Sequence, residues 1–323
     1  MMDWTDRHCR YFLRQVSAHA FLYSEMITTG ALLHGDVERH LAFSAEEHPV
    51  AAQLGGSEPQ ELAACAALVE QFGYDEVNLN IGCPSERVQR GAFGACLMAE
   101  PELVADCVRA MREAVRIPVT VKHRIGLNDM DDYSFMQRFV STVSEAGCRT
   151  FMVHARNAVL KGLSPKENRE VPPLKYDYVY RLKQDFPALE IVLNGGIANA
   201  GPHPGVDGVM LGRAAYHDPW ILSEPGADRR KVVMAMHAYA RKMVSKQTRL
   251  RHVARHVLGL YHGHRRARLW RRMLSDSTRL AQDDPALLLE ALDAVGSPPF
   301  AQAMREPAAT VRWASGPPGT PAG

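Results

Sequence analysis

Residues 78–98, NLNIGCPSERVQRGAFGACLM, decide the fold of this chain. From residue 76 to residue 81, polar and apolar side chains alternate, which is typical of a strand with one polar and one apolar face. The segment 82–85, with its glycine, proline and serine, then predicts a turn. After two further glycines, the apolar run 95–98 carries one thiol. The stretch therefore predicts a cysteine, Cys96, held on a loop at the carboxyl end of a strand.

The chemistry open to Cys96 follows from its thiol. The pKa of a free cysteine, about 8.5, is close enough to neutral pH for the thiol to act as a general acid. Cys83 and Cys96 are thirteen residues apart, which matches no zinc pattern, so we predict no metal site. A free cysteine is often only a small buried apolar residue. The residues alone leave the catalytic and the structural interpretation open.

Strands and helices alternate at short spacing along the first two thirds of the chain. The alternation predicts a parallel sheet with helical crossovers, either a closed barrel or an open doubly wound sheet. No GxGxxG opens a helix, which argues against the open sheet of a dinucleotide-binding domain. The last two predicted strands end in Gly195-Gly196 and Gly212-Arg213, as a barrel needs if backbone N–H groups are to hold a phosphate. We therefore predict a TIM (β/α)8 barrel. Predicted strands are 21–26, 49–54, 76–81, 118–124, 150–154, 191–194 and 208–211; predicted helices are 6–17, capped by Thr5, 59–72, capped by Ser57, 101–115, 133–146 and 177–186.

Charge is divided unevenly along the chain. Between Asp228 and Arg279, fifteen Lys or Arg residues stand against two Asp, a net charge of +13, although the whole chain carries only +2. This asymmetry indicates a polyanion as partner of one part of the molecule. Apolar residues at spacings of three and four predict an all-α domain there. We expect a barrel domain at 1–226, a basic helical domain at 227–295 and a disordered Pro- and Gly-rich tail at 296–323.

The stretch NLNIGCPS…GAFGACLM closely resembles the signature of the tRNA-dihydrouridine synthases, and its order and spacing match subfamily A best. The resemblance continues at widely separated points of the chain. The further matching segments are MDWTDRHCRYF, PVAAQLGG, PVTVKHRIG, VHARNAVLKGLSPKENRE, LNGGI, DGVMLGRAAY and RHVLGLYHGHRRARLWRRMLSD.

The resemblance implies roles for individual residues. Flavin mononucleotide (FMN) would lie across the barrel mouth, and Cys96 matches the family's proton donor. The flavin contacts would be Gln53, Lys122 and His154, and the phosphate contacts Asn194, Gly195, Gly196, Gly212 and Arg213. Asn80 and Arg156 would line the uracil pocket, and the tRNA contacts would be Phe93, Lys166, Arg169, Arg268 and Arg271.

The implied reaction is reduction of the C5–C6 double bond of D-loop uridines in tRNA, at positions 20 and 20a. Reduced flavin would deliver hydride to C6, Cys96 would protonate C5, and NADPH would supply the electrons. The base must leave its stack to reach the flavin, which costs least in a loop. We expect a cytoplasmic monomer that binds tRNA and has no protein partner. The six cysteines are scattered, as in proteins with reduced thiols, and no long apolar run predicts a membrane segment.

Two other functions compete with this one. A small-molecule FMN oxidoreductase of the dihydroorotate dehydrogenase type would share barrel and flavin, but it offers no reason for the basic helical domain. A tRNA-binding homologue with impaired catalysis would keep that domain. A flavin absorbance spectrum and a comparison of bulk tRNA with free uracil or orotate as substrate separate these functions.

The sequence departs from the family in two places. Between Ile197 and Val206, ANAGPHPG stands where the family has a helix, and two prolines with two glycines predict a loop. In the family a strand precedes the segment that here begins at Met1, so we expect the first strand of the barrel to be truncated. A barrel lacking one strand has two unpaired edges. We therefore expect the functional protein to extend upstream by roughly one strand, about 5 to 10 residues.

Overall fold

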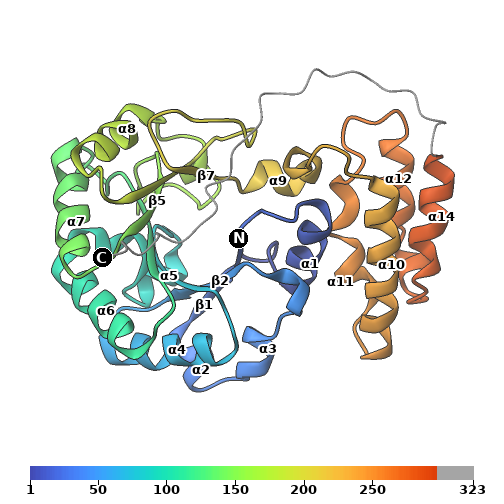
Figure 1. The fold of residues 1–323 in the computed structure, drawn as a ribbon, viewed down its shortest axis with the longest axis horizontal. Helices are drawn as coiled ribbons and strands as arrows, with labels where there is room; N and C mark the ends of the chain where they lie inside the picture. Colours follow the sequence, from blue (N-terminus) through green and yellow to red (C-terminus); the bar gives the residue numbers. More distant parts are fainter. Residues whose placement is uncertain (297–323) are drawn as a thin grey trace, which may run out of the picture.

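The computed structural model describes residues 1–296, and its core is one parallel sheet of seven strands. The sheet order follows the chain order, and each strand pairs in parallel with the next. In Figure 1 the sheet curls into a half-barrel with helices outside it. The strands are β1 (Leu22–Thr28), β2 (Val50–Gly55), β3 (Glu76–Ile81), β4 (Val119–Arg124), β5 (Thr150–His154), β6 (Glu190–Asn194) and β7 (Gly208–Met210).

This sheet confirms the predicted TIM-type architecture, with seven parallel strands in residues 1–296. Within residues 1–296, β1 and β7 are each paired on one side only. The connection between β6 and β7 contains no helix, as the proline and glycine content of ANAGPHPG predicted. The sheet is therefore an open barrel whose strand ends still form one edge, where barrel active sites lie.

Helices cover the outer face of the sheet. Between strands lie α2 (Thr29–Leu33), α3 (Val37–Leu41), η1 (Ala45–Glu47), α4 (Pro59–Gln71), α5 (Glu86–Arg90), η2 (Gly94–Ala99), α6 (Pro101–Ala114), α7 (Tyr133–Glu145), η3 (Glu167–Arg169) and α8 (Tyr176–Asp185). The helix α1 (Arg7–Val16) precedes β1, and α9 (Arg213–His217) and η4 (Pro219–Leu222) follow β7.

Two predicted helix caps were wrong. The carboxylate of Asp6, not the hydroxyl of Thr5, caps α1 by accepting from the backbone N–H groups of His8 (2.9 Å) and Cys9 (3.0 Å). Glu58 occupies the cap position of α4 in place of Ser57, because Pro59 has the fixed φ and the missing N–H that suit a first helical residue.

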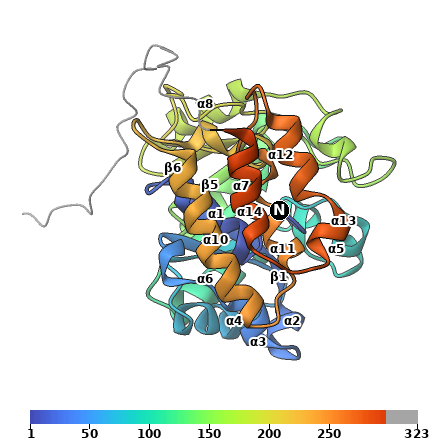
Figure 2. The ribbon, with the colours of Figure 1, turned by 90° about the vertical axis from the view of Figure 1, so that its right-hand side faces the viewer.

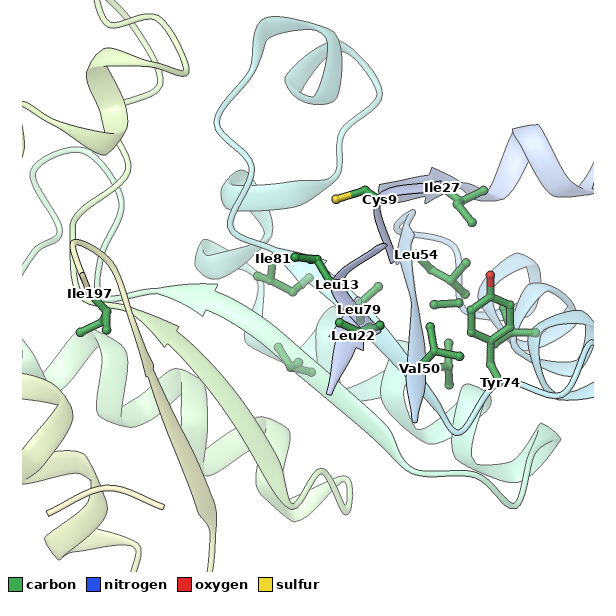
Figure 3. Close-up of a cluster of buried hydrophobic side chains, with 14 of the residues drawn as sticks. Cys9, Leu13, Leu22, Ile27, Val50, Leu54, Tyr74, Leu79, Ile81 and Ile197 are labelled. Carbon is green, nitrogen blue, oxygen red and sulfur yellow. The ribbon is translucent and has the colours of Figure 1, made fainter. Parts of the chain in front are cut away.

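Apolar side chains fill the space between the sheet and the helices. Figure 3 shows part of this core, in which Leu22, Val50, Leu54 and Leu79 on neighbouring strands gather with Tyr74. All of them are buried, and the strand β2 is buried along its whole length. Because alternate residues of a strand face opposite sides, the apolar residues of β3 and β4 pack outward and leave the polar ones facing the barrel interior.

The helices after η4 form a bundle beside the barrel (Figures 1 and 2). They are α10 (Arg229–Ser245), α11 (Leu250–Ala254), η5 (Val257–Gly259), α12 (Ala267–Leu274), α13 (Ser277–Leu280) and α14 (Ala286–Val295). Trp270 is fully buried in the bundle, and its indole N–H donates to the carbonyl of Val257 at 2.9 Å. The expected tail beyond Gly296 lies outside the described residues.

The helix α1 joins the bundle to the barrel. Tyr11 stacks on Tyr239 of α10 with ring centroids 3.9 Å apart, and Nδ1 of His8 lies 2.8 Å from the Tyr239 hydroxyl. Asp6 forms an ion pair with Arg255 at 2.6 Å and lies 3.0 Å from Nε2 of the fully buried His256. The two parts of the chain therefore share a packed and partly charged interface. Within residues 1–296, no helix combines the length and apolarity that a membrane span requires.

Candidate active site

The strand register brings the polar residues of the inner face into layers. Asn78 pairs with Gln53 on one side and Thr120 on the other, and Asn80 pairs with Lys122 one step higher. At the top, the register pairs Arg124 with His154 and His154 with Asn194. Because residues two apart on a strand face the same side, these layers lie inside the barrel near its carboxyl edge. Three of the predicted flavin contacts, Gln53, Lys122 and His154, thus come from three different strands and face one interior.

Cations dominate the upper layers. Burial lowers the pKa of Lys122 to about 8, and neighbouring Arg124 acts in the same direction. Burial also lowers the pKa of Arg124 to about 10 and holds that of His154 well below its usual value, with Arg124 and Lys122 adding to the effect on the histidine. In the described part of the chain, no carboxylate lies within ion-pair distance of Lys122 or Arg124. Buried cations without a counterion are costly, so this site suits an anionic ligand.

Glycines bring the ends of β5 and β6 close together. Gly195 has a φ of 107°, and a Cβ atom there would lie 2.4 Å from Cδ2 of His154. Gly196 also has a positive φ, 68°, so both positions require glycine. The carbonyl of Gly195 accepts from the Tyr176 hydroxyl at 2.6 Å, and the amide of Asn194 donates to the carbonyl of Met210 at 2.7 Å. Backbone can therefore approach a ligand closely at this corner.

The other predicted phosphate contacts lie at the start of α9. Arg213 pairs with Glu170 at 2.6 Å, so its charge is partly neutralised at the rim. Gly212 lies against the side chain of Met1, whose sulfur is 3.2 Å from the position of an added Cβ. The predicted uracil contact Arg156 donates to the carbonyls of Glu170 and Pro172 in the same rim loop.

The two cysteines of the defining stretch lie in different surroundings. Cys83 lies in the turn directly after β3, where its thiol donates to the Ser85 hydroxyl at 3.4 Å. Cys96 lies on η2, where its thiol donates to the carbonyl of Phe93 at 3.1 Å and burial raises its pKa. Both thiols therefore follow β3, and the assignment of the proton donor to Cys96 stays a prediction.

The turn between the two cysteines explains this arrangement. Gly94 has a φ of 76°, and the next N–H, that of Ala95, donates to the carbonyl of Cys83 at 3.0 Å. The chain therefore folds back and packs η2 against β3. The ring of Phe93 lies over the end of β2, 2.9 Å from an added Cβ on Gly55, where it remains partly exposed.

Arg124 holds three loops together at the strand ends. Its Nε donates to the carbonyl of Gly82 at 3.0 Å, and its Nη1 donates to the carbonyls of Asn157 (3.0 Å) and Asn168 (2.8 Å). Asn168 is fully buried within the loop that carries the exposed side chains of Lys166 and Arg169. The sequence analysis missed this role of Arg124, because a charge at the end of a strand could equally face solvent.

A cavity of about 660 Å³ lies next to the Cys83 turn. It is lined by residues that follow β3 and by the loop after β5: Pro84, Glu86, Gln89 and Leu160 to Pro165. Gln89 donates to the carbonyls of Pro84 (2.8 Å) and Leu160 (3.0 Å), so its amide bridges the two walls. The volume lies within the range of small-molecule pockets.

The remaining candidates lie on the helical bundle. Arg268 and Arg271 are exposed on α12, three residues apart and hence on one face, while Trp270 between them points into the core. Within residues 1–296, no three His, Cys, Asp or Glu side chains gather as metal ligands would.

Comparison with known proteins adds to this geometry. The family model described as dihydrouridine synthase (Dus) matches residues 1–295. A Pseudomonas putida protein called tRNA-dihydrouridine(20/20a) synthase is 54% identical over 307 residues, covering 91% of this chain and 91% of that protein. Proteins of the same name from Pseudomonas syringae pv. tomato (56% over 304 residues; 90% of each chain) and Escherichia coli K12 (55% over 310 residues; 91% of this chain and 90% of that protein) are similarly related.

Among solved structures, a 2-naphthoyl-CoA reductase in complex with 2-naphthoyl-CoA aligns with a TM-score of 0.50 at 10% sequence identity. The alignment covers 67% of this chain and 46% of the reductase. At this identity the likeness concerns the fold alone.

Proposed function

This chain belongs to the dihydrouridine synthase family, and from that premise we propose that it reduces the C5–C6 double bond of uridines 20 and 20a in tRNA. The observation that carries the proposal is the barrel mouth, where Lys122 and Arg124, both partly or fully removed from water, have no carboxylate partner in the described chain. Such a site suits an anionic cofactor and a proton transfer next to it.

FMN fits the residues of this site. Lys122 and Arg124 have no carboxylate partner, so an anion would balance their charge. Gly195 lies against His154 and has no Cβ atom, so the space that a Cβ would fill is open to a ligand. We assign flavin contacts to Gln53, Lys122 and His154, and phosphate contacts to Asn194, Gly195, Gly196, Gly212 and Arg213. When bound, FMN would supply the hydride, with NADPH as the source of electrons.

The protein's own part is to hold the uracil and to move a proton. We assign the proton transfer to C5 to the thiol of Cys96, which follows β3 on η2 and matches the proton donor of the family. The ammonium group of Lys122 would stabilise the negative charge that builds in the transition state. Asn80 and Arg156 remain the candidates for contact with the uracil.

The RNA is held by exposed cations. Lys166 and Arg169 follow β5 at the rim, the partly exposed ring of Phe93 lies over the end of β2, and Arg268 and Arg271 extend the charge onto α12. Neutralised phosphates would supply most of the affinity and make it salt-dependent. We keep the division into a catalytic domain at 1–226 and an RNA-binding domain at 227–295, in a cytoplasmic protein that acts as a monomer.

The test compares two single variants on tRNA from a strain that makes no dihydrouridine. Cys96→Ala should purify yellow and lose about 10²- to 10⁴-fold in turnover, measured by mass spectrometry of the nucleosides, because only the proton donor is lost. Cys83→Ala is the matched control and should keep more activity, because its turn can tolerate a small residue.

The opposite ranking would move the proton transfer to Cys83. A wild-type protein that binds flavin and reduces orotate or free uracil, but not tRNA, would instead be a small-molecule oxidoreductase. A colourless protein that only binds tRNA would be a homologue without catalysis.

A further inference from the structure

One buried side chain closes the loop that follows β5. Oδ1 of Asn168 accepts from the backbone N–H of Val159 at 2.8 Å, and Nδ2 of Asn168 donates to the carbonyl of Val159 at 2.8 Å. Facing residues of antiparallel strands exchange two hydrogen bonds in the same way, but here a side chain takes the place of one backbone. The two ends of the segment 159–168 are therefore held together. We call this segment the Asn168 loop.

The rest of the Asn168 amide binds the interior of the loop. Nδ2 lies 3.2 Å from the carbonyl oxygen of Leu163 and 3.3 Å from that of Ser164. Asn168 is fully buried, so the polar atoms of its amide depend on these partners. Because a backbone N–H can only donate, Oδ1 must face Val159 and the NH₂ group must face the carbonyls. The position requires an acceptor and two donors together, which a carboxylate, a hydroxyl or an apolar side chain does not provide.

The Asn168 loop is also fixed to the barrel. Nη1 of Arg124, at the end of β4, donates to the backbone carbonyl of Asn168 at 2.8 Å. Oδ1 of Asn128 accepts from the backbone N–H of Leu160 at 2.9 Å, and Nε2 of Gln89 donates to the Leu160 carbonyl at 3.0 Å. Both ends of the loop are thus anchored to segments that lie outside it.

The outer side of the Asn168 loop carries cations. Lys161 and Lys166 lie within the loop and Arg169 follows it, and all three side chains are exposed. An exposed loop without internal bonds samples many conformations, and a ligand that orders it loses part of its binding free energy as conformational entropy. A loop that is already held in one conformation avoids this loss. The buried amide therefore arranges in advance the backbone that carries the charges.

We propose that Asn168 is a positioning residue, which holds the Asn168 loop in its RNA-binding conformation so that Lys166 and Arg169 meet tRNA without further ordering. The inference rests on the proposed function, in which these two cations contact tRNA. Asn168 acts from below the surface and does not touch the RNA.

The first measurement is the affinity of the full-length holoenzyme for tRNA that lacks dihydrouridine. Asn168→Ala should raise the Kd about 10-fold, because the RNA must then order the loop. Asn199→Ala is the matched control, since it makes the same change in another loop, where the side chain is exposed and accepts from the backbone N–H of Gly201 at 3.1 Å. The control should change the Kd by less than about 2-fold. Wild-type affinity in Asn168→Ala would overturn the proposal.

A second comparison shows whether Asn168 acts through the two cations. In a protein that already carries Lys166→Ala and Arg169→Ala, adding Asn168→Ala should change the Kd by less than about 2-fold, because the loop then has no proposed contact left to position. A further loss as large as the one in the wild-type background would mean that Asn168 supports the fold in general. That result would overturn the positioning role.

The loop itself is tested without RNA by limited proteolysis. Trypsin cleaves after Lys161 when the surrounding segment opens locally. Asn168→Ala should accelerate this cleavage about 10-fold, read by peptide mass spectrometry, while cleavage after Lys246, exposed at the end of α10, keeps its wild-type rate. Equal acceleration at both sites, or an unchanged rate at Lys161, would overturn the proposal.

Failure of this inference and failure of the proposed function give different results. A wild-type protein that binds no tRNA would refute the proposed function, and with it any role of the loop in RNA binding, whatever the cleavage rates. A wild-type protein that binds tRNA, with an Asn168→Ala variant of equal affinity, would refute the positioning role alone.

Discussion

The barrel mouth and the helical bundle both present positive charge, but they do so in opposite ways. At the mouth, Lys122 and Arg124 are few and desolvated, and Arg124 is held by its bonds to three backbone carbonyls. On the bundle, Arg268 and Arg271 belong to a large set of cations and are exposed. Salt screens exposed charges strongly and buried charges weakly. One buried cation should therefore have a large effect that salt does not alter, whereas one exposed cation should have a small effect that salt removes.

Replacing Lys122 gives the largest expected effect. Lys122→Met should lower single-turnover reduction of tRNA about 10²- to 10³-fold, equivalent to about 3–4 kcal/mol, because a preorganised charge near the reacting atoms is lost. The loss should be the same at low and high salt. Thermal stability without flavin should not fall, since an unpaired buried cation stabilises nothing. A loss of turnover that disappears at high salt would mean that Lys122 acts as an exposed charge, as the bundle arginines do.

Replacing Glu76 tests how a buried carboxyl group inside the barrel affects the pH dependence of stability. Burial raises its pKa to about 7 from an ordinary value of 4.5, although Thr120 and Tyr23 oppose the shift. A raised carboxyl pKa means that the folded state disfavours the ionised form, so stability is lost as pH rises from about 4.5 through about 7. The loss is on the order of 3 kcal/mol. Glu76→Gln should remove this part of the pH dependence in urea unfolding measured between pH 5 and pH 8, and an unchanged slope would contradict the assignment.

Replacing Asp6 tests the contact between the barrel and the helical bundle. Burial by itself raises the pKa of Asp6, but hydrogen bonds from His256 and Arg255 outweigh it and hold the pKa well below its usual range. A depressed carboxyl pKa stabilises the fold at neutral pH, and this contribution is lost only as pH falls below the usual pKa. Asp6→Asn should cost about 1–2 kcal/mol in urea unfolding at pH 7. The difference from wild type should shrink toward acid pH, and a constant difference would show that charge is not its source.

The bundle arginines give the smallest effect for each residue. Arg268→Glu and Arg271→Glu should each reduce the slope of log affinity against log salt by about one unit if each contacts a phosphate. Arg138→Glu, at an exposed position on α7, is the matched control for the change in net charge. Equal slopes in all three variants would mean that the arginines on α12 are solvated surface and not an RNA contact.

The pattern of the sequence was sufficient to predict much of the architecture. Alternation in residues 76–81 and the spacing of the helical segments predicted the parallel sheet, and proline and glycine predicted the loop before β7. These features are local, because strand period and backbone restriction act over a few residues. The family motifs placed Gln53, Lys122 and His154 at strand ends, and the register brings them to one interior.

Only the tertiary structure decided where the two cysteines lie. Cys83 and Cys96 both follow β3, and the positive φ of Gly94 and the bond from Ala95 to the Cys83 carbonyl fold η2 back against β3. Such a turn depends on packing against other strands, which no local pattern records.

The same holds for the polar side chains inside the barrel below the site. Glu76, Asn78, Thr120 and Gln53 come from three strands, and no spacing along the chain links them. The sequence by itself determined which residues could face inward, because the direction of a side chain alternates along a strand. The register between strands determined which of them meet, because it depends on how the whole sheet packs.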